Sequence, residues 1–322
     1  MNSAGAITIP VRVHAITYEA VGILSFEFRP LAGGDLPAFT AGAHFDVLMP
    51  GGAQRSYSLI NPPTETGRYV IAVNRDPESR GGSSFLCEKV RPGDVLEITP
   101  PSNSFALVEA AERSVFIAGG IGITPLWCMI QHLEVLGRPW RLYYAARTRA
   151  KTAFLTYLER LEAVDPGRVV LTFDHEPGYA MLDLTEVIAE QPPGTHFYCC
   201  GPVGMLKAFE AAAEDRDPDQ IHVEYFSASQ PVAAGGFEVV LARSGAAIWI
   251  PPDKTILEML LAAGHIVPHS CTEGVCGTCE TIVLEGLPDH RDNVLSKRER
   301  ASNKKIMICR SGCLGQRLVL DL

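Results

Sequence analysis

The sequence predicts a chain of three domains: an antiparallel β-barrel, an α/β domain built on a parallel sheet, and a small α+β domain. Three observations support this prediction. The 322 residues exceed what one hydrophobic core usually organises. The spacing of apolar residues changes near Ser114, and four cysteines gather near the C-terminus. We place the three domains at residues 1–109, 110–228 and 229–322.

The first domain consists of short runs that alternate or are rich in β-branched residues, separated by turns. Examples are residues 11–13, 22–28, 44–48 and 68–73, with turns at Gly33-Gly34 and Pro92-Gly93-Asp94 between them. Many short strands at this spacing are typical of an all-β barrel or sandwich.

A polar strand, Arg55-Ser56-Tyr57-Ser58-Leu59, lies in this domain. Alternation places Arg55 and Tyr57 on one face of the strand and Ser56 and Ser58 on the other. A planar ligand at that edge would meet an aromatic ring, hydroxyls and a cation together. The alternative interpretation is an ordinary polar strand.

Further along, the run Arg80-Gly81-Gly82-Ser83-Ser84 precedes a predicted helix. Ser83 or Ser84 would cap that helix, and backbone N–H groups, a hydroxyl and the Arg80 cation would converge on a place suited to phosphate. Together with the polar strand, this run predicts a phosphorylated aromatic cofactor.

The second domain begins with a buried strand at 115–118, followed by apolar residues at helical spacing and by Gly137 as a stop. Strands and helices then alternate. Repeated β-α units predict a parallel sheet with helices on both faces. The later strands are expected at 142–145, 169–173, 196–199 and 222–226, and the later helices at 153–164, 184–189 and 205–213.

Two turns of this domain follow strands and open helices. The first covers residues 119–125 and contains Gly119, Gly120, Gly122 and Thr124; the second begins Cys200-Gly201-Pro202. Such glycines permit close approach of a nucleotide, and the helix N-terminus favours its pyrophosphate. The first turn departs from the strict G-x-G-x-x-G pattern. Both turns are expected at the carboxyl ends of parallel strands, where doubly wound sheets bind ligands.

Residues 227–236 form a linker of small residues, whose ten residues span at most roughly 33 Å. We expect this linker to let the next domain swing or fold back. Beyond it, a hairpin of residues 237–241 and 247–250 and a helix at 255–263 form a compact α+β module.

Four cysteines of this module, Cys271, Cys276, Cys279 and Cys309, have the spacing C-x4-C-x2-C followed by a distant cysteine. This is the plant-type ferredoxin spacing for a [2Fe-2S] cluster. A structural zinc site is the alternative, but zinc ribbons pair two short hairpins, whereas three cysteines here share one loop. Cys313 is a second candidate for the fourth ligand.

Charge and composition limit the classes of partner and the compartment. The net charge is −9, and residues 1–228 carry 18 Lys or Arg against 27 Asp or Glu, so nucleic acid is not an expected partner. Glycines and a proline interrupt the longest apolar run, at 115–130, and we expect no membrane span or export signal. Nine cysteines then favour a reducing cytoplasm. Cys87, Cys128 and Cys199 are expected to be small buried hydrophobes.

Over nearly its whole length the chain resembles the phthalate dioxygenase reductase family of bacterial oxygenase reductases. The shared features are an Arg-x-Tyr-Ser motif at 55–58, a Gly-Gly-x-Gly-x-Thr-Pro turn at 119–125, a Cys-Gly-Pro turn at 200–202, the cysteine pattern, and the ending at 318–322. The resemblance implies a ferredoxin-reductase-like pair of domains and a β-grasp ferredoxin domain. It also implies FMN, NADH and one [2Fe-2S] cluster.

The resemblance further implies the residues that contact each group. FMN contacts are expected at Arg55, Ser56, Tyr57, Ser58, Ala72 and Val73, and phosphate contacts at Arg80, Gly81, Gly82, Ser83 and Ser84. Dinucleotide contacts are expected at Gly119, Gly120, Gly122, Thr124, Gly201 and Pro202. Cys200 would approach the nicotinamide, and Ser58 would hydrogen-bond near flavin N5. Phe226 would cover the flavin ring until nicotinamide displaces it, with Glu224 in the same neighbourhood; the alternative for Phe226 is a core aromatic.

The expected function is that of a reductase component: NADH gives hydride to FMN, and electrons pass singly through the cluster to a Rieske-type terminal oxygenase. A plant-type cluster near roughly −400 mV and a Rieske centre at or above roughly −150 mV make this transfer downhill. The alternatives are a stand-alone NAD(P)H flavin or ferric reductase and a zinc-stabilised nucleotide-binding regulator. FAD remains open beside FMN. NADPH remains possible because residues 146–151 carry three cations and no acid. The chain is expected to be a monomer.

Overall fold

The computed structural model describes residues 7–51, 53–77 and 81–322. The chain separates into two compact units, one that ends at Glu224 and one that begins at Tyr225. The first unit contains both the barrel and the α/β domain, which share one hydrophobic core. The division predicted between residues 228 and 229 therefore lies four residues beyond the boundary between the units.

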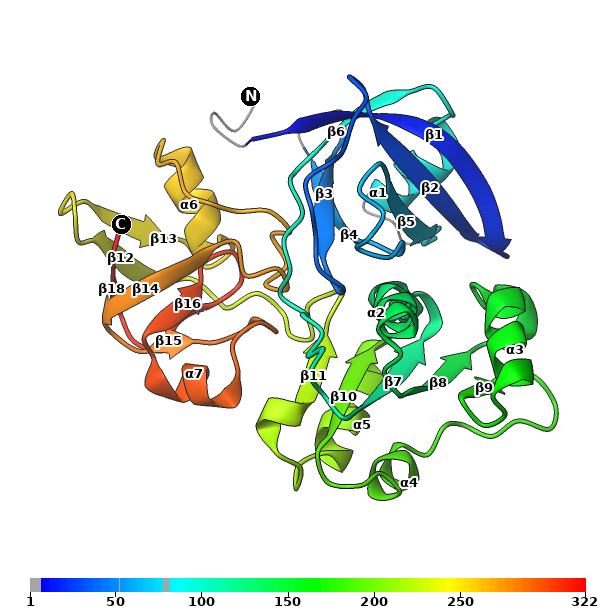
Figure 1. Cartoon of the computed structure of the whole chain (residues 1–322). Coiled ribbons are helices and arrows are strands. Elements are labelled where there is room, and N and C mark those ends of the chain that lie inside the picture. The colour runs from blue at the N-terminus through cyan, green and yellow to red at the C-terminus, as the bar shows by residue number, and fades with distance from the viewer. Residues whose placement is uncertain (1–6, 52, 78–80) are drawn as a thin grey trace. The chain divides into compact units, whose positions relative to one another are not determined.

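The N-terminal part of the first unit is an antiparallel barrel (Figure 1). Its strands pair in the order β4-β3-β6-β1-β2-β5, and a bridge between Leu59 and Ile71 joins the strands at the two ends of that order. The predicted barrel is therefore confirmed. Its elements are β1 (Ile9–Ala20), β2 (Ile23–Pro30), β3 (His44–Leu48), β4 (Gln54–Ser58), β5 (Tyr69–Asn74), α1 (Gly82–Lys89) and β6 (Val95–Ile98).

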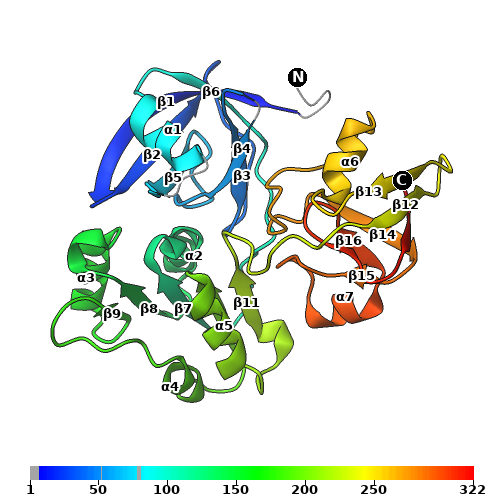
Figure 2. The ribbon, with the colours of Figure 1, turned by 180° about the vertical axis from the view of Figure 1, so that it is seen from behind.

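The second part of this unit is a parallel sheet in the order β11-β10-β7-β8-β9. Right-handed crossovers place α2 and α3 on one face and α4 and α5 on the other (Figures 1 and 2). This confirms the predicted doubly wound domain. Its strands are β7 (Arg113–Gly119), β8 (Trp140–Ala146), β9 (Val169–Phe173), β10 (Thr195–Cys200) and β11 (Ile221–Glu224), and its helices are η1 (Gly120–Gly122), α2 (Ile123–Leu136), η2 (Arg149–Lys151), α3 (Leu155–Val164), α4 (Leu184–Ala189), α5 (Val203–Ala212) and η3 (Pro218–Gln220).

Helix α2 begins and ends where its sequence predicts. Pro125 stands in the first turn, where its missing N–H would have no helical acceptor. Gly137 terminates the helix in the left-handed conformation, with φ 63°. Because η1 leads directly into α2, the helix carries the glycine turn at its N-terminus.

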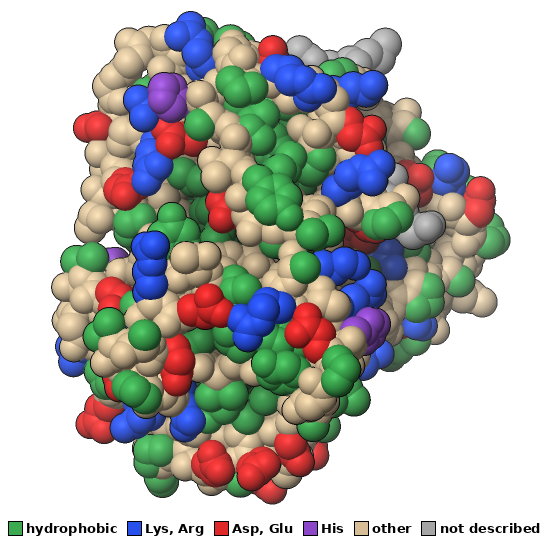
Figure 3. Space-filling model, turned by 90° about the vertical axis from the view of Figure 1, so that its right-hand side faces the viewer, with side chains coloured by type: hydrophobic (Ala, Val, Ile, Leu, Met, Phe, Trp, Pro, Cys, Tyr) green, Lys and Arg blue, Asp and Glu red, His purple; other side chains and the backbone are tan. Residues whose placement is uncertain are grey.

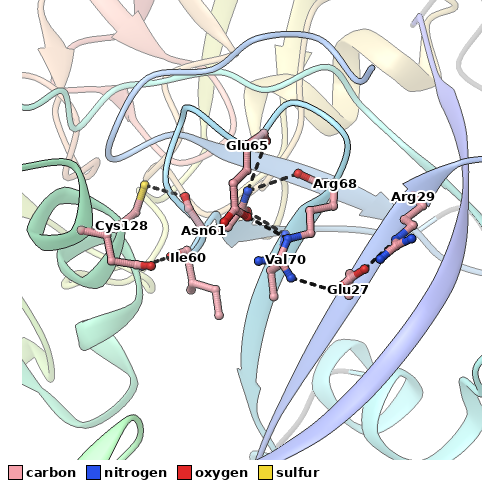
Figure 4. Close-up of polar contacts among 9 residues, drawn as sticks. Glu27, Arg29, Ile60, Asn61, Glu65, Arg68, Val70 and Cys128 are labelled. Carbon is pink, nitrogen blue, oxygen red and sulfur yellow. Dashed lines mark hydrogen bonds and ion pairs between the residues drawn. The ribbon is translucent and has the colours of Figure 1, made fainter. Parts of the chain in front are cut away.

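Contacts between α2 and the loop after β4 tie the two halves of this unit together (Figure 4). The Cys128 thiol donates to the carbonyl oxygen of Asn61 at 3.1 Å, and the Gln131 amide donates to the carbonyl oxygen of Ile60 at 2.6 Å. The Asn61 side chain in turn accepts from the Val70 N–H at 2.9 Å. Cys128 is buried as expected, and its thiol also fixes α2 relative to the barrel.

The second unit is a small α+β domain with its own core. Its main sheet has the order β13-β12-β18-β14-β16, with β12 and β18 parallel and the other pairs antiparallel. This mixed sheet fits the predicted β-grasp domain. The elements are β12 (Phe237–Leu241), β13 (Ala247–Ile250), α6 (Ile256–Ala262), β14 (Glu280–Glu285), β15 (Pro288–Asp289), α7 (Lys297–Ser302), β16 (Lys305–Met307), β17 (Gly312–Cys313) and β18 (Arg317–Leu320).

The surface carries charges of both signs. Among the described side chains on the face drawn in Figure 3, Lys and Arg are interspersed with Asp and Glu. Within the described ranges, no helix combines the length and the apolar character needed to cross a membrane.

Candidate functional site

The polar strand β4 and the N-terminus of α1 form one surface in the barrel. A Cβ atom placed on Gly82 would lie 2.7 Å from Arg55 Cγ and 3.1 Å from the Tyr57 hydroxyl oxygen. Arg55 and Tyr57 therefore share a face, as alternation predicts. The Ser56 hydroxyl donates to Asp46 Oδ1 at 2.6 Å. Burial raises the pKa of Tyr57, so its hydroxyl stays protonated.

The N-terminus of α1 has the features of an anion site. Gly81 has φ 98°, a left-handed conformation that favours glycine. Among the described residues no side chain caps this helix, and its first turn contains no acidic residue. Ser83 Oγ accepts from the Asp76 N–H at 3.2 Å, and Ser84 Oγ donates to the Gly81 carbonyl oxygen at 3.3 Å. Arg80, the predicted phosphate cation, lies outside the described residues.

The remaining predicted flavin contacts differ in position. Ser58 is buried at the end of β4, where it pairs with His44 of β3. Ala72 and Val73 lie in β5, and their side chains are buried in the core. Any contact that these two residues make with a cofactor would therefore use backbone atoms, and their assignment stays a prediction.

The two glycine turns of the α/β domain pack directly on each other. A Cβ on Gly122 would lie 2.2 Å from the Cys200 carbonyl oxygen, and one on Gly119 would lie 2.5 Å from Pro202 Cδ. A Cβ on Gly201 would lie 3.0 Å from Gly119 Cα. These glycines let the ends of β7 and β10 meet, and the two predicted dinucleotide motifs become one backbone surface.

Hydrogen bonds inside the first turn hold its shape. The Thr124 hydroxyl donates to the Ile121 carbonyl oxygen at 3.0 Å, so this side chain closes the turn. The Tyr144 hydroxyl of β8 donates to the Gly120 carbonyl oxygen at 3.0 Å. Nothing in the sequence pattern indicates the Tyr144 contact, because it joins segments that only the folded sheet brings together.

Cys200 and Glu224 end neighbouring strands, and their side chains meet. Cys200 Sγ lies 4.0 Å from Glu224 Oε2. Burial raises the pKa of the Cys200 thiol and raises the pKa of Glu224 to about 8. Near neutral pH both groups are therefore mainly uncharged, and Cys200 is not a nucleophilic thiolate.

Phe226 follows β11 by two residues, because the strand ends at Glu224 instead of continuing to 226 as predicted. Its side chain is 42% exposed. The alternative interpretation of Phe226 as a core aromatic is therefore wrong.

The four predicted cluster cysteines come together in the C-terminal unit. Cys271, Cys276 and Cys279 lie in the loop between α6 and β14, and Cys309 follows β16. Cys271 Sγ neighbours the sulfurs of Cys276 and Cys309, and the Cys309 sulfur also neighbours that of Cys279. The neighbouring Cys276 and Cys309 thiols lower the pKa of Cys271, and the Cys309 thiol lowers the pKa of Cys279.

The rival ligand Cys313 lies apart from this group. Its sulfur accepts from the Gly315 N–H at 3.2 Å and contacts the Arg317 carbonyl oxygen at 3.5 Å. Around the gathered thiols, Gly274 and Gly277 have φ 70° and 77°, and the Glu273 N–H donates to Cys271 Sγ at 3.3 Å. Three sulfur donors in a tightly folded loop and a fourth after β16, with a backbone N–H directed at sulfur, suit a [2Fe-2S] cluster.

Comparison with known proteins agrees with this geometry. Residues 116–211 match an oxidoreductase NAD-binding domain, and residues 239–313 match a 2Fe-2S iron-sulfur cluster binding domain. The structure is similar to that of phthalate dioxygenase reductase, with a TM-score of 0.73, 37% identity and 98% of each chain covered. The chain belongs to the phthalate dioxygenase reductase family. Members of this family are oxidoreductases, and the match supports NADH, FMN and a [2Fe-2S] cluster as cofactors.

Two relatives are similar to this chain over nearly their full length. Phenoxybenzoate dioxygenase subunit beta of Ectopseudomonas oleovorans is 54% identical, with 99% of this chain and 100% of the relative covered. Tetrachlorobenzoquinone reductase of Sphingobium chlorophenolicum is 50% identical, with 98% of each chain covered.

Proposed function

We propose that this chain is the reductase component of a multicomponent oxygenase system. It would take electrons from NADH through FMN and deliver them singly, through a [2Fe-2S] cluster, to a separate terminal oxygenase. The observation that carries this proposal is the presence, in one chain, of a packed pair of dinucleotide turns and four gathered cysteine thiols. The similarity to a dioxygenase subunit along the whole chain supports the oxygenase partner.

The barrel residues would bind and orient FMN. Bound FMN supplies a centre that exchanges two electrons with a nicotinamide and single electrons with a cluster. Arg55 and Tyr57 would flank it, since both side chains border the space above Gly82. The N–H groups at the start of α1 would hold its phosphate, together with Ser83 and Ser84.

The paired turns would bind NADH through backbone atoms of Gly119, Gly120 and Gly122, with Gly201 and Pro202 on the opposite side. Cys200 and Glu224 would border the nicotinamide as uncharged groups. Hydride transfer from the dinucleotide requires no general acid or base, so positioning would supply most of the rate. Ser58 and Phe226 are proposed to complete the site on the flavin side.

In the C-terminal unit Cys271, Cys276, Cys279 and Cys309 would hold the cluster, which accepts one electron at a time. Three of these thiols are buried and Cys276 is half-buried. The loop would thereby exclude most water from the metal site.

NADH is proposed as the donor in preference to NADPH. Arg149, a candidate 2′-phosphate contact after β8, is ion-paired with Glu159, and its backbone N–H donates to Glu176 Oε1 at 2.6 Å. Its guanidinium also lies 5.0 Å from the centre of the Phe173 ring. The cation is therefore already occupied. Steady-state kinetics with both dinucleotides test this preference.

Replacement of one cluster cysteine tests the proposed function. In Cys276→Ser we expect NADH-dependent flavin reduction to continue while cytochrome c reduction falls by at least about tenfold, because the cluster lacks a ligand. Cys313→Ser is the matched control, since this thiol lies outside the gathered set, and it should retain both activities. Unchanged cytochrome c reduction in Cys276→Ser would sink the proposal.

A second candidate function is a stand-alone reductase for a small acceptor. The 50% identity to tetrachlorobenzoquinone reductase favours it. Copurification and turnover with an oxygenase encoded nearby would support the first candidate, whereas efficient quinone reduction without any partner protein would support the second. In either case we propose a cytoplasmic monomer. The nine cysteines support a reducing compartment, and the presence of all three binding regions in one chain supports a monomer.

A further inference from the structure

The segment between β11 and β12 is fastened to the loops around the cluster cysteines. Residues 227–236, the linker that we expect to let the next domain swing or fold back, belong to the compact C-terminal unit. In Figure 1 it is the yellow-green segment between the labels β11 and β12. We call residues 227–233 the strap.

Asn293 holds the beginning of the strap. Its Nδ2 donates to the Ser227 carbonyl oxygen at 3.2 Å, and its Oδ1 accepts from the Ser229 hydroxyl at 2.5 Å. The backbone N–H of Asn293 donates to the Gly274 carbonyl oxygen at 2.8 Å, between Cys271 and Cys276. A single residue thus connects the strap to the cluster loop.

Arg310 holds the rest of the strap and directly follows Cys309. Its guanidinium donates to the Gln230 carbonyl oxygen, with Nε at 3.1 Å, and its own carbonyl oxygen accepts from the Ala233 N–H at 3.0 Å. A Cβ on Gly274 would lie 3.0 Å from Arg310 Cβ. The strap is therefore tied to both parts of the chain that carry cluster cysteines.

These bonds hold the strap within the C-terminal unit from Ser227 onward. Phe226, the proposed cover of the flavin ring, stands one residue before the carbonyl group that Asn293 holds. The Asn293 side-chain amide therefore helps to hold the backbone next to Phe226 against the cluster loop.

We propose that Asn293 is a positioning residue for electron transfer into the cluster. By fixing the strap against the cluster loop, it would set the route from Phe226 to Cys271 and Cys276. The inference rests on the proposed function, in which one electron at a time leaves reduced FMN and enters the oxidised cluster without any bond being made or broken. Small displacements lower the rates of positioned reactions steeply.

The test uses the oxidised holoprotein and Asn293→Ala. Hydrogen exchange in the peptide that covers residues 227–236 should become about tenfold faster or more, because the loss of one hydrogen bond corresponds to about this factor. The visible spectrum of the cluster should not change. In stopped flow, NADH should reduce the flavin at the normal rate, whereas cluster bleaching should slow by about tenfold.

Two further variants separate this role from a general loss of structure. Asn293→Asp keeps the Ser229 contact, removes the donor to Ser227, and should reproduce both effects. Ser229→Ala leaves the Ser227 contact in place and should change both quantities less.

Unchanged exchange in the strap, a normal rate of cluster reduction, or equal slowing of flavin reduction and cluster reduction would overturn the inference. A wild-type protein without cluster or flavin would overturn the proposed function instead, and the exchange measurement distinguishes the two failures because it needs no turnover.

Discussion

At the scale of single residues, the candidate site depends on glycines, which have no side chain, as much as on its polar side chains. Gly122 lacks the Cβ that would meet the Cys200 carbonyl group, and Gly82 lacks the one that would meet Arg55 and Tyr57. The sequence indicates that these glycines matter. It does not indicate which partners exclude the Cβ, because those partners belong to distant segments.

Gly82→Ala is expected to weaken flavin binding. The added methyl group would crowd Arg55 Cγ at 2.7 Å, so the face shared with Tyr57 must shift. We expect an affinity loss of about tenfold or more, corresponding to one or two kcal/mol of overpacking. Flavin fluorescence titration of the apoprotein measures it. Gly67→Ala is the control, since a Cβ there meets nothing within 4 Å, and equal flavin affinities in the two variants would contradict the argument.

Because of Glu224, we expect stability and kcat/KM for NADH to change with pH near pH 8. Burial raises its pKa from 4.5 to about 8, so the folded protein favours the neutral acid. The stability contributed by this group is complete below pH 4.5, declines as the unfolded state ionises, and is lost as pH rises through about 8. Glu224→Gln stays neutral and should remove a step near pH 8 from the profile of kcat/KM for NADH. A step of the same size in the variant would exclude Glu224 as its source.

At the scale of elements, β10 and β11 carry a stack of rings. His222 lies between Tyr198 and His196, with ring centroids 4.4 Å and 5.3 Å away, and His196 Nδ1 lies 3.0 Å from His222 Nε2. Burial, followed by the charge of His196, lowers the pKa of His222 from 6.5 to about 4. The folded stack therefore favours the neutral form of His222.

Lowering the pH should reduce the stability that the β10–β11 ring stack contributes to the fold. The folded pKa of His222 is depressed, so its contribution is present above pH 6.5 and is lost as pH falls towards 4. His222→Phe keeps an aromatic ring in the stack and should reduce the fall in Tm between pH 7 and 4.5 by about 3 °C. Scanning calorimetry at both pH values measures this. His175→Gln, at an exposed histidine, is the control, and an equal fall in wild type and His222→Phe would refute the argument.

The elements themselves could largely be predicted from the sequence. Strand β9 and helix α4 have the predicted bounds, since apolar periodicity and turn residues act locally. Strand β11 ends before Tyr225, where the chain passes to the other unit, and no local signal marks that point. The contacts of Asn61 with α2 and of Asn293 with Gly274 were not predictable, because each joins segments that only tertiary packing brings together.

At the scale of the whole molecule, the two units have separate cores while the barrel and the parallel sheet share one. A division before Tyr225 therefore falls between two cores, whereas the boundary predicted at 109 falls inside the unit that shares one core. Cutting the chain at the first boundary should separate flavin reduction from the cluster, whereas cutting it at the second should disrupt folding.

A chain stopped after Ser227 tests this division. We expect it to fold, bind flavin and reduce ferricyanide with NADH at a rate close to that of the full chain, because its core is complete. Cytochrome c reduction should be lost with the cluster cysteines. A fragment of residues 110–228 should be insoluble or partly unfolded by circular dichroism. A well-folded 110–228 fragment, or a Ser227 truncation without flavin, would contradict the shared core.

The position of β18 also determines the order of events during synthesis. This strand is latest in the sequence, yet it lies in the middle of its sheet, between β12 and β14. The first unit can fold as soon as Glu224 has left the ribosome, but the C-terminal sheet remains open until Leu320 emerges. Throughout that interval the four cysteines lie in an incomplete domain, so cluster insertion must follow the synthesis of β18, and cells short of assembly factors should accumulate flavin-loaded protein without a cluster.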